Sequence, residues 1–213
     1  MNITKNNYDI YHFNKSPVVG PEAGKKFMRR EHLSYALNAA STNGVALEFG
    51  VRTGKTFNQI CEHRLNEMNH GFDSFEGLPE DWEMSPGAVA LAGRQQDNVP
   101  IPVCPKNGKF WVGWFDTTID EYIKENKEVA ISFIHVDCDI YSSTKTIFDK
   151  LNNLIKPGCV IVFDEFHPWG NKKYNTWQEH EYKALKEWVN TYDREFQVLA
   201  HTNHWQCSIK ITK

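Results

Sequence analysis

The sequence predicts an α/β protein built on a doubly wound, mostly parallel sheet, and three observations carry this prediction. Apolar segments of strand length alternate with segments of helical periodicity along most of the chain. Residues 129–136 and 159–163 are apolar at almost every position, as expected for strands that are covered on both faces. Two strand-like segments joined by a short Asn-containing turn close the chain, which predicts a C-terminal antiparallel hairpin.

The first half of the chain opens with a polar and aromatic segment, residues 1–21, which we expect to form an N-terminal arm before a single domain at 22–213. Phe27, Leu33, Leu37 and Ala40 recur at helical spacing, so a helix is expected over 22–41, and Asn43-Gly44 ends it. Its basic residues, Lys25, Lys26, Arg29 and Arg30, are expected to form a solvated face. An apolar strand at 45–49 leads through a glycine turn to a helix at 55–66, and a second strand follows at 71–73.

The proline-rich segment 77–108 is too long for an ordinary connection, and we expect it to act as a lid loop. After it, a strand at 110–115 precedes a helix at 119–126, and the apolar strand 129–136 follows. Apolar residues line one side of a helix at 142–155, which Pro157-Gly158 is expected to stop before the strand 159–163. The last elements are a helix at 177–192 and the hairpin strands 196–201 and 205–211.

The composition excludes several classes of protein. The net charge of the 213 residues is −3, which argues against a protein that binds nucleic acid through a basic surface. No apolar run reaches the roughly 18 residues of a membrane span, and the N-terminus lacks the apolar core of a secretion signal. The five cysteines are never spaced as Cys-x-x-Cys, so neither a zinc site nor a disulfide framework is indicated. We therefore expect a cytoplasmic protein.

The turn after the first strand reads Glu48-x-Gly50-x-x-x-Gly54 and has three interpretations. Its glycines allow a tight turn and close approach of a nucleoside ligand at a helix N-terminus. Gly54-Lys55-Thr56 also resembles the end of a phosphate loop, but three residues separate the glycines where a P-loop has four. A plain strand-to-helix turn is the third interpretation.

The second strand ends at Asp73, about 25 residues after the first glycine turn. A carboxylate at this place in a parallel sheet typically holds the two hydroxyls of a ribose. A P-loop enzyme has no need of such a residue. Asp73 therefore favours an adenosine-containing ligand, with a simple turn residue as the alternative.

Acidic residues follow the next two apolar strands at Asp137, Asp139, Asp164 and Glu165. Because neighbouring parallel strands end about 4.8 Å apart, these carboxylates are expected to converge. Crowded carboxylates repel one another unless a cation holds them, and an all-oxygen set favours Mg²⁺. The alternatives are a helix-start role for Asp139 and solvated loop charges for Asp164 and Glu165, while His167 is either a nearby base or a structural histidine.

Five segments in this order carry a resemblance to a known family. They are residues 48–54, the run Phe-Asp-Ser-Phe-Glu-Gly-Leu-Pro at 72–79, Gly-Trp-Phe-x-x-Thr at 113–118, residues 135–144 with Asp-x-Asp-x-Tyr-x-Ser-Thr, and residues 160–166. Over about residues 45–190 the chain resembles class I S-adenosylmethionine (SAM)-dependent methyltransferases of the macrocin O-methyltransferase type. The resemblance implies a Rossmann-like, seven-stranded sheet whose last strand is antiparallel.

The resemblance also implies roles for individual residues. It implies a metal ion bound by Asp137, Asp164 and Glu165, although sugar-modifying members commonly have Asp where Glu165 stands. It implies Asp139 as the catalytic base, and we take His167 as the second choice. The expected donor-binding residues are Glu48, Gly50, Gly54, Asp73, Ser74, Trp114, Phe115 and Asp137, with Trp114 and Phe115 beside the adenine.

The sequence thus predicts a SAM-dependent, Mg²⁺-dependent O-methyltransferase acting on a hydroxyl of a small molecule such as a sugar, a phenol or another natural-product-like acceptor. The alternatives are a P-loop-like nucleotide hydrolase and a donor-binding module without catalysis. Methylation of a nucleic-acid base is not expected, because Asp137-Cys138-Asp139-Ile140 stands where such enzymes usually have Asn/Asp-Pro-Pro-aromatic. We expect neither a nucleic-acid nor a membrane partner, and the aromatic N-terminal arm would suit a homodimer.

Overall fold

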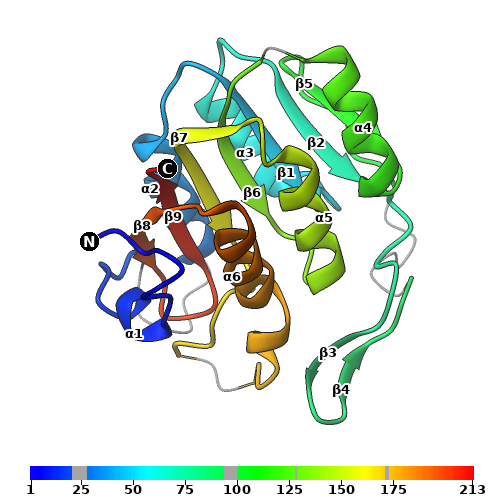
Figure 1. Ribbon diagram of the computed structural model, residues 1–213. Helices are drawn as coiled ribbons and strands as arrows, with labels where there is room; N and C mark the ends of the chain where they lie inside the picture. The colour runs from blue at the N-terminus through cyan, green and yellow to red at the C-terminus, as the bar shows by residue number, and fades with distance from the viewer. Residues whose placement is uncertain (21–27, 94–99, 128, 171–172) are drawn as a thin grey trace.

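A seven-stranded sheet forms the centre of the protein in the computed structural model, which describes residues 1–20, 28–93, 100–127, 129–170 and 173–213 (Figure 1). The strand order is β5-β2-β1-β6-β7-β9-β8. The first five strands of this order are parallel, and β9 runs antiparallel to both β7 and β8. The predicted doubly wound α/β fold with a C-terminal antiparallel hairpin is confirmed. The strands are β1 (Val45–Phe49), β2 (Asn69–Asp73), β5 (Gly108–Val112), β6 (Ile131–Val136), β7 (Ile155–Phe163), β8 (Phe196–His201) and β9 (Cys207–Ile211).

Helices cover both faces of the sheet, which explains the continuous apolar runs of its central strands. On one face α2 (Met28–Ala39) and α3 (Lys55–His63) bury Leu33, Leu37 and Ile60 against β1, β6 and β7. On the other face lie α4 (Phe115–Glu125), α5 (Tyr141–Leu151) and α6 (Glu181–Tyr192). Every residue of β1 and β6 is buried, so their side chains leave water on both faces and stabilise the sheet through the hydrophobic effect.

Some element boundaries differ from the sequence prediction. Phe115 is the first residue of α4 and not the end of a strand. Pro157-Gly158 lies inside β7, whereas we expected it to stop a helix before the strand. The pairing of β7 with β6 shifts register in this region, and an irregular pairing tolerates a proline that cannot donate a hydrogen bond. The helix predicted over 177–192 is divided into the 3₁₀ helix η2 (Trp177–Glu179) and α6.

The N-terminal residues pack against the β8 edge of the sheet. Ile3 forms a β-bridge with Phe196, and the short helix α1 (Ile10–Phe13) brings Phe13 into the core. The Phe13 ring lies 4.9 Å from the ring of Phe166, measured between centroids. Residues 22–27 of the predicted helix, with Lys25 and Lys26, lie outside the described residues, and α2 begins at Met28.

A two-stranded hairpin occupies part of the predicted lid segment. Its strands are β3 (Trp82–Ser85) and β4 (Ala88–Ala90), and it stands beside the main sheet in Figure 1. The hairpin is held by the segment before η2, because Ser85 Oγ donates to the carbonyl of Lys173 at 2.9 Å. Residues 94–99 of the segment lie outside the described residues, and a lid role for 77–108 stays a prediction.

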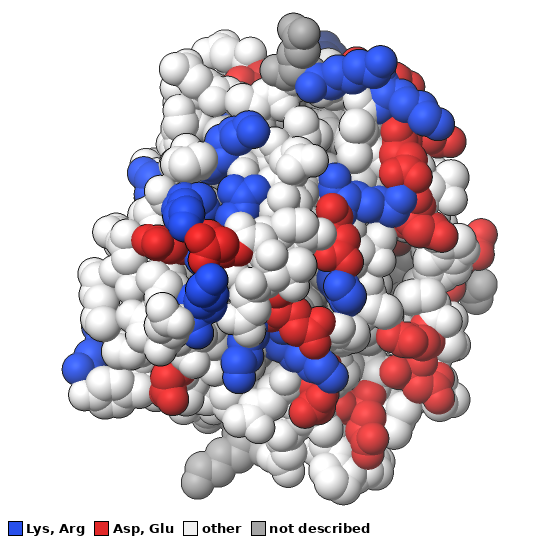
Figure 2. Space-filling view, in the orientation of Figure 1, with Lys and Arg blue, Asp and Glu red and all other residues white. Residues whose placement is uncertain are grey.

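The charged side chains are mixed in sign on the face that Figure 2 shows, where Lys and Arg stand among Asp and Glu. Within the described part of the chain, none of the helices has the length and apolarity needed to cross a membrane.

Candidate active site

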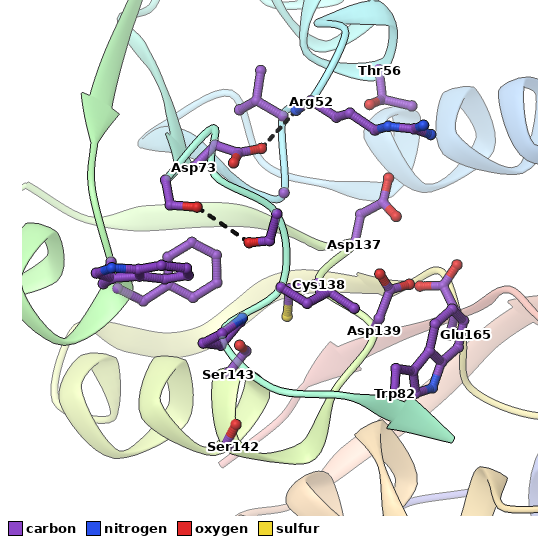
Figure 3. Close-up of a pocket in the computed structure, with 18 of the residues that line it drawn as sticks. Arg52, Thr56, Asp73, Trp82, Asp137, Cys138, Asp139, Ser142, Ser143 and Glu165 are labelled. Atoms are coloured by element: carbon purple, nitrogen blue, oxygen red, sulfur yellow. Dashed lines mark hydrogen bonds between the residues drawn. The ribbon is translucent and has the colours of Figure 1, made fainter. Parts of the chain in front are cut away.

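A cavity of about 1090 Å³ opens at the carboxyl ends of the parallel strands, where ligands bind in open α/β sheets (Figure 3). The turn after β1 forms one wall of it and the residues after β2 form another. The loop after β6 and the first turn of α5 contribute Asp137, Asp139 and Ser142. Trp82 of the hairpin and Trp205 also line the cavity. The cavity therefore combines the predicted donor turn and the predicted acidic residues in one space.

Gly50 is required by the close approach of two neighbouring strand ends. Its φ of 95° is in the left-handed region, and a Cβ at this position would lie 1.8 Å from the carbonyl oxygen of Asp137. Gly50 lines the cavity, and its role in donor binding stays a prediction. Gly54, at φ 74°, begins α3 from the N-cap position and does not line the cavity.

A Gly50→Ala substitution is therefore expected to destabilise the fold by about 3 kcal/mol or more, because it adds a backbone clash to an unfavourable φ. Denaturant unfolding followed by circular dichroism measures this loss. Gly87→Ala is the matched control: Gly87 also has a positive φ, of 79°, but no atom lies within 4 Å of the position that its Cβ would take. Equal losses of unfolding free energy in Gly50→Ala and Gly87→Ala would contradict a contribution from the backbone clash at Gly50.

Asp73 is held at the end of β2 with its carboxylate at the cavity wall. Its Oδ2 accepts a hydrogen bond from the backbone N–H of Arg52 at 2.7 Å (Figure 3). Its Oδ1 accepts one from the N–H of Phe75 at 2.7 Å. The carboxylate is thus oriented before any ligand arrives. Ser74, Trp114 and Phe115 also line the cavity, and Trp114 is 40% exposed.

Glu48 lies beneath the cavity and not in its lining. The side chain is fully buried, and its Oε1 pairs with Nδ1 of His135 at 2.8 Å. His135 Nε2 in turn lies 3.7 Å from Oδ1 of Asp164. Burial alone would lower the pKa of His135, but the hydrogen bond with Glu48 and the nearby Asp164 carboxylate outweigh it and raise the pKa to about 10.

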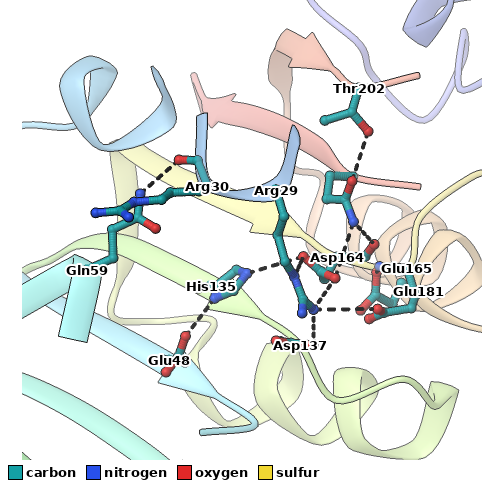
Figure 4. Close-up of polar contacts among 11 residues, drawn as sticks. Arg29, Arg30, Glu48, Gln59, His135, Asp137, Asp164, Glu165, Glu181 and Thr202 are labelled. Atoms are coloured by element: carbon teal, nitrogen blue, oxygen red, sulfur yellow. Dashed lines mark hydrogen bonds and ion pairs between the residues drawn. The ribbon is translucent and has the colours of Figure 1, made fainter. Parts of the chain in front are cut away.

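The predicted acidic residues converge, and Figure 4 shows Asp137, Asp164 and Glu165 close together. Side-chain oxygens of Asp137, Asp139 and Glu165 lie within 4.8 Å of one another, and a second such group joins His135, Asp137 and Asp164. Asp137, Asp139 and Glu165 line the cavity, whereas Asp164 lies behind them with a 2% exposed surface. We call the four carboxylates of Asp137, Asp139, Asp164 and Glu165 the acidic cluster.

Arg29 of α2 enters the acidic cluster, which the sequence did not predict. Its Nη2 contacts Oδ1 of Asp137 at 2.6 Å and Oδ2 of Asp164, and it lies 3.7 Å from Oε1 of Glu165. Its Nε donates to Oδ1 of Asp164 at 2.5 Å. Arg29 was expected on a solvated face. Helical periodicity indicates which positions of a helix are exposed, but it does not indicate that a long exposed side chain contacts residues at the ends of neighbouring strands.

Burial and mutual repulsion perturb the acidic cluster. Burial, with the charges of Asp137 and Asp164, raises the pKa of Asp139 to about 8. Burial also raises the pKa of Asp137, to about 6, in spite of Arg29. The charge of Arg29 holds the pKa of Asp164 far below its usual range although burial opposes this. Crowding and burial therefore favour the protonated forms of Asp137 and Asp139, whereas Arg29 favours the ionised form of Asp164.

A fifth buried acid, Glu181, lies next to the cluster at the start of α6 (Figure 4). Its Oε2 accepts from the backbone N–H of Glu165 at 3.1 Å, while its Oε1 has no hydrogen-bond partner among the described residues. Burial raises the pKa of Glu181 well above its ordinary value. Sequence reasoning missed it, because an acid in the first turn of a helix is ordinary on a protein surface.

His167 is not part of the cavity lining. Its ring packs against Trp169 and Trp177, at centroid distances of 4.7 and 4.4 Å, and burial lowers its pKa to about 4. Asp139 lines the cavity, and its side chain forms no hydrogen bond or ion pair within the described residues. The geometry therefore favours Asp139 over His167 as the base.

Comparison with known proteins identifies the class. A family model described as a methyltransferase domain matches residues 47–166, which is more than half of the chain. The chain belongs to this methyltransferase family, and its fold is that of the class I, SAM-dependent methyltransferases. No curated protein matches the sequence.

The fold is similar to that of several solved methyltransferases at low sequence identity. The calicheamicin methyltransferase CalS11 is 18% identical with a TM-score of 0.66, over 87% of this chain and 80% of that chain. The O-methyltransferase NovP is 16% identical with a TM-score of 0.61, over 87% and 80%. The mycinamycin-pathway methyltransferase MycE, solved with Mg and S-adenosylhomocysteine (SAH), is 12% identical with a TM-score of 0.56, over 91% of this chain and 51% of that one.

Proposed function

We propose that the chain transfers a methyl group from SAM to a hydroxyl of a small molecule, assisted by Mg²⁺, as an O-methyltransferase of the macrocin type. One observation carries the proposal: the acidic cluster and the turn that follows β1 open into the same cavity. The names of NovP, an O-methyltransferase, and of CalS11, a TDP-rhamnose 3'-O-methyltransferase, support O-methylation, because these proteins are similar to the chain in fold.

The donor would occupy the side of the cavity formed by Asp73 and the turn after β1. The oriented Asp73 carboxylate suits the two ribose hydroxyls, and Gly50 gives the backbone room to approach the ligand. Trp114 and Phe115, at the start of α4, offer apolar surface for the adenine. The cavity volume of about 1090 Å³ exceeds that of a usual one-ligand pocket, so it accommodates a donor and a small acceptor together.

The carboxylates suit Mg²⁺, which prefers hard oxygen ligands. Asp137, Asp139 and Glu165 bring oxygens within 4.8 Å of one another, and Oε2 of Glu165 is buried without a hydrogen-bond partner among the described residues. Asp137 and Glu165 would hold the ion at the cavity wall, with Asp164 behind them. When bound, Mg²⁺ lowers the pKa of a hydroxyl that coordinates it.

Asp139 would take the proton of the acceptor hydroxyl. The acceptor oxygen then forms a bond to the methyl carbon while the bond from that carbon to the sulfonium sulfur breaks, which leaves a methyl ether and neutral SAH. The chain also aligns the two substrates in one cavity, which lowers the entropic part of the activation free energy of methyl transfer. Trp82 and Trp205 line the cavity and would form the acceptor wall, and Trp82 lies on the Asp139 side in Figure 3.

Removal of divalent metal is expected to lower methyl transfer by at least about tenfold, because the acceptor hydroxyl then loses its Lewis acid. The measurement is SAH formation after EDTA treatment and after readdition of Mg²⁺, with SAH affinity by calorimetry as the control. Full turnover in the metal-free protein would contradict the Mg²⁺ part of the proposal.

A nucleotide hydrolase is the second candidate, favoured only by Lys55, which lines the cavity after Gly54. We expect SAH to raise the thermal unfolding midpoint more than ATP. Both ligands carry an adenosine that can meet Asp73, but the glycine turn is too short to cradle the phosphates of ATP. Stabilisation by ATP alone would favour the hydrolase.

A homodimer through the N-terminal arm also remains part of the proposal, and sedimentation analysis tests it.

A further inference from the structure

The position of one guanidinium nitrogen is the starting observation. Nη2 of Arg29 lies within 3.7 Å of a carboxylate oxygen of each of Asp137, Asp164 and Glu165 (Figure 4). These are the three residues for which the family resemblance implies a metal ion. The chain thus places a cation of its own between the expected metal ligands.

We propose that Arg29 is a tethered cation that competes with a divalent metal ion for the acidic cluster. The inference rests on the proposed function only in taking the cluster as a metal site. When Arg29 is paired, the cluster is neutralised from within the chain. When the ion is bound, Arg29 has left, so the metal affinity is lower than the carboxylates alone would give.

Simultaneous occupancy is excluded by distance and charge. Mg²⁺ binds carboxylate oxygens at about 2.0–2.1 Å, and Mn²⁺ takes similar sites of oxygen ligands. Nη2 of Arg29 already contacts Oδ1 of Asp137 at 2.6 Å. An ion bound to the same oxygens would meet both the volume of the guanidinium and its positive charge. One cation therefore displaces the other.

The exchange needs only the side chain of Arg29 to move. This side chain is 43% exposed, so a path to solvent exists. After its departure Asp164 keeps neighbouring donors, because Nε2 of Gln206 lies 3.3 Å from its Oδ2 and His135 lies 3.7 Å from its Oδ1. Asp137 has no other side-chain partner among the described residues, so its carboxylate becomes free for the ion.

The charge balance makes the exchange favourable at sufficient metal concentration. The acidic cluster brings four acidic side chains together, three of them at Arg29, and a fifth, Glu181, lies beside Glu165. Replacement of a monovalent guanidinium by a divalent ion adds one positive charge at the point where carboxylates crowd. The released guanidinium regains water, which limits the cost of breaking its ion pairs.

The test is a Mn²⁺ titration of the full chain, with free Mn²⁺ followed by electron paramagnetic resonance. Arg29→Ala is expected to bind Mn²⁺ at least about tenfold more tightly than the wild type, a size typical of changes beside a metal site. Arg29→Lys, which keeps the charge, should stay near the wild type. Arg30→Ala is the matched control, because Arg30 is the next residue of α2, is exposed and points away from the cluster in Figure 4.

A second measurement uses the wild type and does not depend on a variant that folds. The Nε–H resonance of Arg29, identified by its loss in Arg29→Lys, is expected to shift on addition of Mg²⁺ as its bond to Asp164 breaks. Equal Mn²⁺ affinities of wild type and Arg29→Ala, or an unmoved resonance at saturating Mg²⁺, would overturn the competition alone. Absence of Mn²⁺ binding in every variant would overturn the competition together with the metal site. SAH binding in the same samples tests the donor site separately.

Discussion

The Asp139→Asn variant is expected to bind SAH as tightly as the wild type and to lose methyl transfer by about 10²- to 10⁴-fold, the usual contribution of a general base. The substitution removes the proton acceptor with little change in shape. Asp139 has a φ of 65°, a left-handed conformation that asparagine adopts readily, so the backbone of the variant is not strained. Its side chain forms no hydrogen bond or ion pair within the described residues, so the fold loses no contact.

The measurement pairs SAH calorimetry with the initial rate of SAH formation. Asp120→Asn is the control, because Asp120 is an exposed carboxylate of α4 whose ion pair with Lys150, at 2.7 Å, lies outside the cavity. The control should retain full turnover. An active Asp139→Asn variant would remove Asp139 from the role of the base and return His167 to consideration.

The Asp73→Ala variant is expected to bind SAH about 30- to 1000-fold more weakly, which corresponds to two hydrogen bonds to a charged group at about 1–2 kcal/mol each. The carboxylate is oriented by the N–H groups of Arg52 and Phe75 and presents its remaining acceptor capacity to the cavity. Calorimetry with SAH gives the dissociation constant directly.

The control for Asp73→Ala has to separate ligand binding from loss of a turn. Asp81→Ala serves this purpose, because Oδ1 of Asp81 accepts a backbone N–H from Ala92 at 2.7 Å but Asp81 does not line the cavity. It should leave SAH affinity unchanged. An unchanged dissociation constant in a folded Asp73→Ala variant would contradict the assignment of Asp73 to the ribose.

The fold could be predicted because its central strands carry a strong local signal. Strands β1 and β6 are buried at every position, so their apolar runs stand out from the sequence, and the acids that follow strand ends meet at one edge. Asp73, Asp137, Asp139 and Glu165 line one cavity for this reason.

The parts that escaped prediction depend on contacts between distant segments. Arg29 reaches the acidic cluster from α2, 108 residues before Asp137 in the chain, and its periodicity marks it only as exposed. Glu48 was expected at the donor, but its pairing with His135 places it below the cavity. Glu181 is the first residue of α6 and is buried only because α6 docks on the sheet beside β7.

The central claim is that one cavity holds the donor on Asp73 and a cation on the acidic cluster. A crystal structure with SAH and Mn²⁺ tests it most directly. We predict ribose hydroxyls within hydrogen-bond distance of Asp73, an anomalous Mn²⁺ peak on the carboxylates of Asp137 and Glu165, and Arg29 displaced from them. SAH bound elsewhere, or a saturated crystal with no peak at the cluster, would contradict the account.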